Sequence, residues 1–323
     1  MRKPGARRAA SRGEIVLAFA AVYLLWGSTY LAIRFGVETI PPFILAGLRH
    51  LTAGLLLFAW MRLRGTPAPE PRHWRSAAII GGLLLLGGNG LVTWAEQRVP
   101  SGLAAIIVAS VPIWMTVLDG IQNRERPHGV VIVGLALGLA GLAFLIAPGR
   151  LAGGSRVDPL GAAALLTAAL LWAVGSLASR RAALPSSTLL AVSMEMIAGG
   201  AILLATASLA GEWRGFALAA VSQRSLLSLA YLIVAGSLLG FSAYIFLLGA
   251  TTPARVSTYA YVNPVVAVFL GWAIAREPVT PRTLLAAAVI VGAVALIIRH
   301  GARRRAGKME EDTMPLRAEG GRR

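Results

Sequence analysis

The chain has 323 residues, of which 56% are hydrophobic and 14% are charged, with a formal net charge of +17 and no cysteine. Soluble globular proteins carry about 25% charged residues, so this composition indicates a membrane protein. The lack of cysteine excludes disulfides and thiolate metal sites.

The positive charge is concentrated at the two ends of the chain, with five of the 31 Lys and Arg in residues 2–12 and eight in residues 299–323. Basic tails beside membrane spans follow the positive-inside rule, so we expect both termini on the cytoplasmic side and no nucleic-acid partner. The loops between spans carry basic residues about equally on both sides and give no further bias. The tail 299–323 is polar and is predicted to be disordered.

Ten runs of the chain are long and apolar enough to span a bilayer, which needs about 20 such residues. They lie at residues 14–34, 42–61, 76–96, 101–121, 128–147, 159–179, 187–210, 225–249, 253–274 and 282–298. The first run lacks a small-residue cleavage site, so we expect it to be a retained span rather than a signal peptide. The sequence therefore predicts one all-α membrane domain with ten transmembrane helices.

The first run carries Trp26 about twelve residues from its start, which is too deep for the aromatic belt at the membrane interface. Ser28, Thr29 and Tyr30 follow directly, and an aromatic wall with a few hydroxyls suits a small amphipathic solute. We expect these four residues to line a solute pathway. An interfacial anchor for Trp26 is the alternative.

Charged and amide side chains are rare inside the predicted spans. Arg49, with His50 beside it, lies in the second run, Asn89 deep in the third and Glu195 in the seventh. Ionisable residues within a membrane are costly and are candidates for function, so Glu195 is a candidate for proton coupling. A structural Arg49–Glu195 contact, or an Arg49 that reaches toward the nearer surface, is the alternative.

Pro112 and Pro264 lie near the middle of the fourth and ninth runs. Each proline leaves a carbonyl four residues earlier without its donor, and such a carbonyl must face protein or water. We predict hinges that border a central cavity. Kinks that only allow helices to pack are the alternative, and the two interpretations are compatible.

The sixth, eighth and ninth runs supply further aromatic and polar candidates. Trp172 has Ser176 one turn later, Tyr244 lies in the eighth run, and Tyr259 and Asn263 share one helix face in the ninth. Such groups also join helices, at about 0.6 kcal/mol per hydrogen bond in a membrane. The residues expected to contact a solute are Trp26, Ser28, Thr29, Tyr30, Asn89, Trp172, Ser176, Tyr244, Tyr259 and Asn263.

The chain repeats itself under a shift of 152 residues, which brings Pro112 onto Pro264, Glu125 onto Glu277 and Gly88 onto Gly240. Five spans per half is an odd number, so the second half must insert upside down relative to the first, as in many secondary transporters. The Arg-Glu pairs that contain Glu125 and Glu277 are predicted to lock the turn before the last span of each half. The predicted parts are a basic tail (1–13), a first repeat (14–147), a linker (148–158), a second repeat (159–298) and the tail 299–323.

The sequence contains none of the common catalytic motifs. HExxH, GxSxG and a Walker loop are all absent, as are paired carboxylates at metal-binding spacing. We therefore expect no enzymatic activity, no cofactor and no metal site.

Three stretches resemble the EamA family of the drug/metabolite transporter superfamily: Leu25–Tyr30, the segment from Pro41 to Arg49, and Ala260–Ala267. The pre-helix residues Glu125 and Glu277 also match that family. The resemblance implies ten helices in two inverted five-helix repeats, with a central cavity and both termini cytoplasmic.

The resemblance further implies an inner-membrane secondary transporter that exports a small amphipathic metabolite, amino acid or drug by alternating access. A solute exchanger or importer on the same fold remains open, as does a membrane assembly subunit without transport. The expected partners are a small-molecule substrate, protons and the lipid bilayer, and the expected state is a monomer or weak homodimer.

Overall fold

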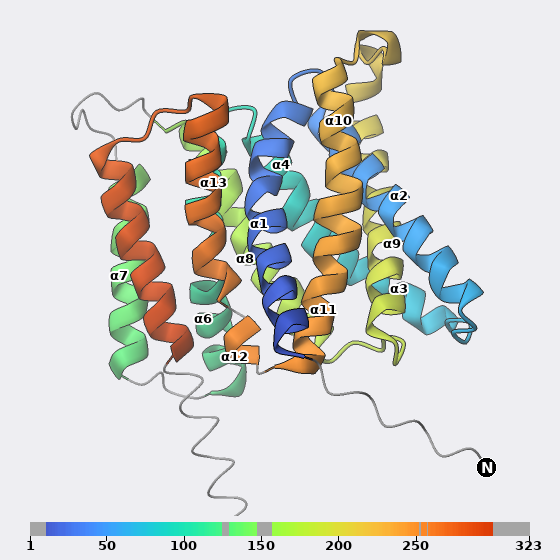
Figure 1. The fold of residues 1–323 in the computed structure, drawn as a ribbon, viewed down its shortest axis with the longest axis horizontal. Helices are drawn as coiled ribbons and strands as arrows, with labels where there is room; N and C mark the ends of the chain where they lie inside the picture. Colours follow the sequence, from blue (N-terminus) through green and yellow to red (C-terminus); the bar gives the residue numbers. More distant parts are fainter. Residues whose placement is uncertain (1–10, 125–128, 147–156, 252, 257, 300–323) are drawn as a thin grey trace, which may run out of the picture.

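The structure is a computed structural model that describes residues 11–124, 129–146, 157–251, 253–256 and 258–299. Within these ranges every regular element is a helix, and the helices pack side by side as a bundle (Figure 1). Eight of the described helices are long and apolar enough to cross a membrane, and Gly129–Leu145 and Tyr259–Ala275 are shorter apolar helices. Every one of the ten predicted runs contains helix. Glu125, most of the predicted linker and most of both tails lie outside the described residues.

In chain order the elements are α1 (Arg12–Gly36), α2 (Pro42–Leu63), α3 (Pro71–Gly81), η1 (Gly82–Gly90), α4 (Leu91–Ala95), α5 (Ser101–Val108), α6 (Val111–Asn123), α7 (Gly129–Ile146), α8 (Pro159–Ser179), α9 (Thr188–Leu209), η2 (Glu212–Arg214), η3 (Leu218–Ala220), α10 (Gln223–Tyr231), η4 (Leu232–Leu239), α11 (Gly240–Ala250), α12 (Pro253–Val256), α13 (Tyr259–Ala275) and a final helix (Pro281–Arg299). The start of α1 and the end of the final helix lie at the same end of the bundle, which we call the tail end (Figure 1). The opposite end, where α1 ends and α10 begins, is the far end.

Two of the spans contain a π-helical segment in their middle. The third span runs through α3, η1 and α4, and the eighth through α10, η4 and α11, where η1 and η4 are π-helical. The two segments overlap under the 152-residue shift. The sequence predicted plain α-helices at both places. Single π turns within α-helices occur frequently at functional sites.

Pro112 and Pro264 each lie near a break in the helix of their span, but at different distances along the chain from that break. The break between α5 and α6 comes directly before Pro112, which is at the start of α6. Pro264 lies inside α13, and the break between α12 and α13 comes several residues earlier, before Tyr259. The predicted interruptions are therefore present in both halves, while the hinge role of Pro112 and Pro264 stays a prediction.

Glycines let α2 and α9 pack backbone against backbone. A Cβ atom added to Gly200 would lie 2.5 Å from the backbone nitrogen of Leu51, and one added to Gly54 would lie 2.8 Å from that of Ile197. Small residues at helix contacts are the usual means of close approach in membranes, where burial from water provides no driving force.

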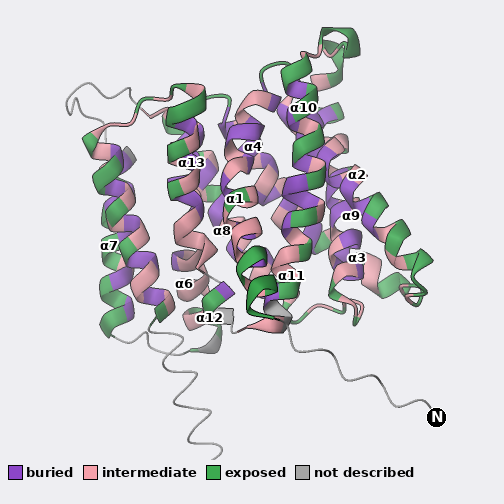
Figure 2. Ribbon diagram, in the orientation of Figure 1, coloured by how far each residue is buried: buried purple, intermediate pink, exposed green. Residues whose placement is uncertain are grey.

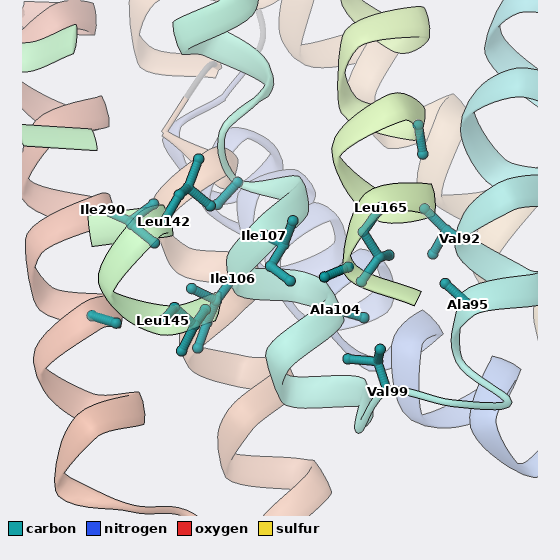
Figure 3. Packing of buried hydrophobic residues seen from close by; sticks show 14 residues of the cluster. Val92, Ala95, Val99, Ala104, Ile106, Ile107, Leu142, Leu145, Leu165 and Ile290 are labelled. Atoms are coloured by element: carbon teal, nitrogen blue, oxygen red, sulfur yellow. The ribbon is translucent and has the colours of Figure 1, made fainter. Parts of the chain in front are cut away.

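An aliphatic cluster fills the space between α4, α5, α7, α8 and the final helix (Figure 3). Its labelled members are Val92, Ala95, Val99, Ala104, Ile106, Ile107, Leu142, Leu145, Leu165 and Ile290. The outward faces of the helices are exposed (Figure 2) and carry many large apolar side chains, such as Leu17 at 72% exposure. Such a surface suits contact with lipid.

Glu277 holds its own turn through a hydrogen bond from its backbone N–H to the carbonyl of Gly271 (3.0 Å), and its side chain acts on the other half of the chain, which the sequence did not predict. Its carboxylate accepts hydrogen bonds from the backbone N–H groups of Ser101 (2.8 Å) and Gly102 (3.1 Å), at the start of α5. The first N–H groups of a helix have no partner within the helix, so a carboxylate there is favourable. The role is structural, and its partner is α5.

We expect Glu277→Gln to lower the free energy of unfolding by about 1–2 kcal/mol, because a neutral amide is a weaker acceptor for the two N–H groups. Thermal unfolding of the purified protein in detergent measures this. Glu38→Gln is the matched control, since Glu38 makes only an exposed ion pair with Arg224 at the same end. Equal losses in the two variants would contradict this role of Glu277.

Candidate functional site

An aromatic cluster joins α1, α11 and α13 in the middle of the bundle. The ring of Trp26 lies with its centroid 5.3 Å from that of Phe241 and 5.2 Å from those of Tyr244 and Tyr259. The contacts with Phe241 and Tyr259 are edge-to-face, a favoured arrangement for aromatic pairs. Three of the predicted solute contacts, Trp26, Tyr244 and Tyr259, therefore lie together.

The π-helical segment η4 positions Trp26. The indole Nε1 donates a hydrogen bond to the carbonyl oxygen of Gly236 (3.1 Å). The indole also lies against Gly240, where a Cβ atom would collide with it. A side chain at position 240 would therefore force the indole of Trp26 or the helix around Gly240 to shift.

Trp172 on α8 makes the corresponding contact in the other half. Its ring lies against Gly88 of η1, where an added Cβ would be 2.7 Å from a ring carbon. Gly88 and Gly240 are paired by the 152-residue shift, and Trp26 and Trp172 lie in matching spans. Each tryptophan therefore packs on the π-containing span of the opposite half.

Asn263 follows Tyr259 by one turn on α13. It is only 8% exposed, and its Oδ1 has no hydrogen-bond partner among the described residues. The backbone carbonyl of Asn263 lies close to Gly27, so α13 and α1 are in tight contact here. A buried amide oxygen without a partner is costly and calls for a functional explanation.

The remaining predicted residues lie around this centre in several groups. Thr29 donates its hydroxyl to the carbonyl of Trp26 (2.6 Å), and Ser28 hydrogen-bonds with the Tyr231 hydroxyl of α10 (2.6 Å). Asn89 pairs through Oδ1 with the Nε2 of His50 (3.1 Å).

Tyr30 packs against the aliphatic cluster of Figure 3. Trp172 and Ser176 lie on α8, and no contact found among the described residues joins them to the aromatic cluster.

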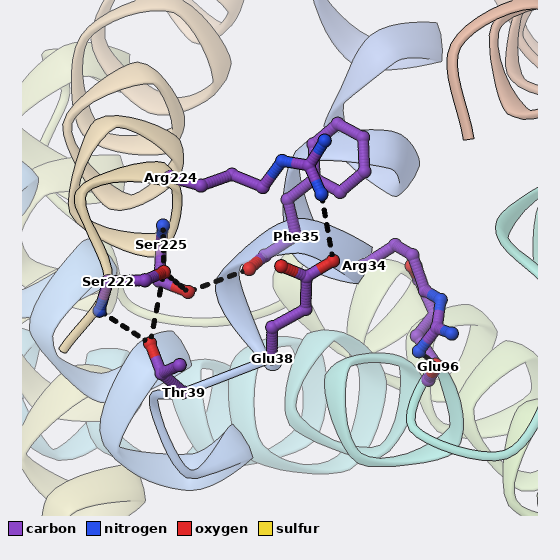
Figure 4. Close-up of polar contacts among 8 residues, drawn as sticks. All are labelled: Arg34, Phe35, Glu38, Thr39, Glu96, Ser222, Arg224 and Ser225. Atoms are coloured by element: carbon purple, nitrogen blue, oxygen red, sulfur yellow. Dashed lines mark hydrogen bonds and ion pairs between the residues drawn. The ribbon is translucent and has the colours of Figure 1, made fainter. Parts of the chain in front are cut away.

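A set of polar contacts connects α1 to the start of α10 at the far end (Figure 4). Ser225 donates to the carbonyl of Phe35 (2.8 Å), the Ser222 N–H donates to Thr39 (3.0 Å), and Arg224 pairs with Glu38 (3.4 Å). We call this group the far-end clasp. Sequence reasoning missed it because its members lie in connections and at helix ends, where polar residues are ordinary.

A cleft of about 410 Å³ opens beside the far-end clasp. Three arginines and one glutamate are among the residues that line it, namely Arg34, Glu38, Arg224 and Arg276. The cleft therefore carries an excess of positive charge.

Two charged residues are buried within the helix bundle. Arg49 is 4% exposed and donates through Nε to Ser237 (3.0 Å), while its Nη1 has no partner among the described residues. Glu96 is fully buried, and neither carboxylate oxygen has a partner there. Glu195 makes no ion pair with Arg49 within the described ranges, so the alternative of a structural Arg49–Glu195 contact does not hold. The proton-coupling role of Glu195 stays a prediction.

Arg49, Glu96 and Glu195 differ in how easily the sequence identifies them as buried charges. Arg49 and Glu195 stand out because they interrupt apolar runs, whereas Glu96 comes at the end of one and resembles an interfacial residue. No group of three His, Asp or Glu that could hold a metal occurs within the described residues.

Comparison with known proteins places the chain in a family. A family model described as "EamA-like transporter family" matches residues 13–147 and 159–299. The "Uncharacterized inner membrane transporter YedA" of Escherichia coli (strain K12) is 43% identical over 284 residues, which cover 87% of this chain and 89% of the relative. The "Probable amino-acid metabolite efflux pump" of the same organism is 26% identical over 297 residues, which cover 87% and 93%.

The fold has a counterpart of known structure. One crystal structure superposes with a TM-score of 0.61 at 22% identity, and the match covers 91% of this chain and 99% of the other. This likeness concerns the fold alone. The two family matches together take in most of the chain, and the chain therefore belongs to the EamA-like transporter family.

Proposed function

We propose that the protein is an inner-membrane secondary transporter that exports a small amphipathic solute by alternating access. The observation that carries the proposal is the pair of tryptophan–glycine contacts, Trp26 on Gly240 and Trp172 on Gly88, beside the two π-helical segments. Interrupted helices at corresponding places in two halves are where transporters of this kind bind their solutes. The E. coli relative that is 43% identical is itself called an inner membrane transporter.

The two halves are proposed to be inverted five-span repeats that move against each other. Each tryptophan contact joins a span of one half to the π-containing span of the other. Any rocking of one half against the other therefore changes both contacts together. This coupling would let one end of the pathway open as the other closes.

The proposed solute has an apolar body and one or two polar groups. The aromatic cluster offers apolar and ring contacts, and Asn263 offers an unpartnered amide oxygen. An amino acid, a metabolite or a drug of this kind fits, and the relative named an amino-acid metabolite efflux pump supports that choice. A lone deep arginine, Arg49, argues against a multiply phosphorylated solute.

A transport screen with purified protein in liposomes tests the proposal. We expect saturable flux of at least one solute in a panel of amino acids and drugs. No flux across the panel would favour the assembly-subunit alternative. Flux driven only by exchange, or only inward, would favour the exchanger or the importer.

Because the chain has no native cysteine, single cysteines at positions 26, 172, 259 and 263 test the pathway directly. We expect water-soluble thiol reagents to reach these positions and added solute to protect them. If none reacts from either side, the cavity assignment is wrong. If only some positions react, the aromatic cluster around Trp26 and the Trp172 contact on α8 belong to different sites.

Asn263→Ala is expected to reduce transport about tenfold, the cost of one lost hydrogen bond to solute of about 1.4 kcal/mol. Its stability should change little, because Oδ1 has no partner to lose among the described residues. Flux and thermal unfolding are measured on the same preparation.

Asn89→Ala is the matched comparison for that prediction. Its amide is hydrogen-bonded to His50, so stability should fall by about 1 kcal/mol. If Asn263→Ala is destabilised as much as Asn89→Ala while flux per folded molecule is unchanged, Asn263 serves only to hold helices together.

The proposed orientation puts both tails in the cytoplasm. A reporter that is active only in the cytoplasm should be active when fused after Arg299 and silent when fused after Arg150. The two positions are separated by an odd number of predicted spans, so they must lie on opposite sides. The reverse pattern would invert the assignment.

A further inference from the structure

Glu96 is a buried carboxyl group at the far end of the third span, one residue beyond Pro71–Ala95. Its side chain is fully enclosed, and neither oxygen has a hydrogen-bond partner among the described residues. Its backbone carbonyl is 3.5 Å from Nη1 of Arg34, the neighbour shown in Figure 4. The preceding residue, Ala95, packs in the aliphatic cluster. A charged carboxylate in this position would lack the hydrogen bonds that normally stabilise it.

Four charged or titratable groups lie near enough to Glu96 to interact with it electrostatically. They are Tyr30 and Arg34 on α1, Arg49 on α2 and Glu277 in the loop after α13. Burial raises the pKa of Glu96 well above its usual range, the charge of Glu277 raises it further, and the two arginines lower it. Glu277 accepts two backbone N–H bonds from α5, whereas the carboxyl group of Glu96 has no hydrogen-bond partner among the described residues, so burial favours the protonated form of Glu96.

Arg49 is close enough to sense the charge of Glu96, yet the two make no ion pair within the described residues. Arg49 is instead held by Ser237 of η4, and its Nη1 has no hydrogen-bond partner in the described part of the chain. If Glu96 lost its proton, its negative charge would attract Arg49. For the two side chains to form an ion pair, Arg49 would have to leave Ser237 or the surrounding helices would have to move. Protonation of Glu96 is thus tied to the packing of α2 against the π-helical segment of the eighth span.

Arg34 provides a connection from this site to the far-end cleft. The same guanidinium that approaches the Glu96 carbonyl also lines the cleft of about 410 Å³. Arg34 therefore connects the backbone at Glu96 with the cleft at the far end, and the expected proton path runs from that cleft rather than past the aromatic cluster.

We propose that Glu96 is the proton-binding carboxyl of the transport cycle and that Arg49 is the counter-charge it meets after releasing its proton. The proposal rests on the proposed transport function and adds its coupling ion. The proton is taken from water at the far end and is held while the carboxyl is enclosed. Its release to water leaves a carboxylate that pairs with Arg49, which frees Ser237.

The test uses dicyclohexylcarbodiimide, an apolar reagent that adds a protonated carboxyl group across its C=N bond, on the full chain in liposomes. Mass spectrometry locates the modified residue over a series of pH values. We expect Glu96 to be labelled at neutral pH and to lose labelling as the pH rises and its proton leaves. Glu70, an exposed carboxylate paired with Arg72, is the internal control and should stay unlabelled.

Two variants should move the midpoint of labelling in opposite directions. Arg49→Gln removes a positive neighbour and should raise the midpoint by about one pH unit or more, whereas Glu277→Gln removes a negative neighbour and should lower it. A midpoint that neither variant moves, or no labelling of Glu96 at any pH, would contradict the assignment of these neighbours and of the proton to Glu96.

Flux measurements then connect the proton to transport, with the panel solute that gives saturable flux. Glu96→Gln should lose flux driven by a pH gradient but keep exchange of labelled for unlabelled solute, and Glu96→Asp should retain part of both. Labelling at Glu195 in place of Glu96, or wild-type flux that ignores a pH gradient, would overturn the proposal and leave transport itself standing. Absence of any flux would overturn both, so the two failures are distinguishable.

Discussion

Gly200→Leu should prevent the bundle from assembling, and Gly200→Ala should lower its free energy of unfolding by about 1–3 kcal/mol. A Cβ at this position would lie 2.5 Å from the backbone nitrogen of Leu51 and 2.9 Å from its Cα. These are backbone atoms of α2, so no side-chain rotation can relieve the collision and the two helices must separate. Thermal unfolding in detergent and the yield of monodisperse protein measure the effect.

Gly292→Ala is the matched control for this prediction. Gly292 lies in the final helix, and an added Cβ there meets no atom within 4 Å. Alanine is the better helix former, so the control should be neutral or more stable by up to about 1 kcal/mol. If Gly200→Ala is as harmless as the control, the close packing of α2 on α9 is not what holds the bundle together.

Trp26→Ala should abolish transport and lower the free energy of unfolding by about 3 kcal/mol, as expected for removal of a packed indole. The ring contacts three aromatic residues, and its N–H occupies the carbonyl of Gly236. Trp26→Phe keeps a ring and loses the N–H, so its loss of stability should be smaller. Flux per folded molecule separates the effect on transport from the effect on folding.

Trp60→Ala provides the comparison, since Trp60 lies on α2 with 47% of its surface exposed. It should retain transport and most of its stability. Equal damage from the two substitutions would show that loss of any tryptophan harms this protein, and it would remove the special role given to Trp26.

Eight helices of membrane-spanning length and two shorter apolar helices were predictable from the sequence because length and hydropathy decide them. The first run, predicted at 14–34, is found as α1 from Arg12 to Gly36. The π-helical segments were not predictable. Apolar residues and glycines fit an α-turn or a π-turn equally well. Here the π-turns occur beside tryptophans of the other half of the chain, and the local sequence contains no sign of those contacts.

The members of the aromatic cluster were candidates from the sequence, but their arrangement was not predictable, and their role as solute contacts stays a prediction. The depth of Trp26 in its run marked it as a candidate, and Tyr244 and Tyr259 do lie against it. Trp172 is not part of this cluster. It lies against Gly88, where it repeats the contact between Trp26 and Gly240 with the two halves exchanged. Glu96 was missed because burial of a residue at the end of a span depends on which other elements cover it.

The bond between Glu277 and α5 has a consequence for biosynthesis. The acceptor lies 176 residues after Ser101, in the other half of the chain. At a synthesis rate of about 5–20 residues per second, the start of α5 waits roughly 10–35 s before its partner leaves the ribosome. The first half is therefore inserted in the membrane with an unfinished helix start. A nascent chain truncated before Glu277 should consequently be recognised and degraded by membrane proteases more readily than the completed protein.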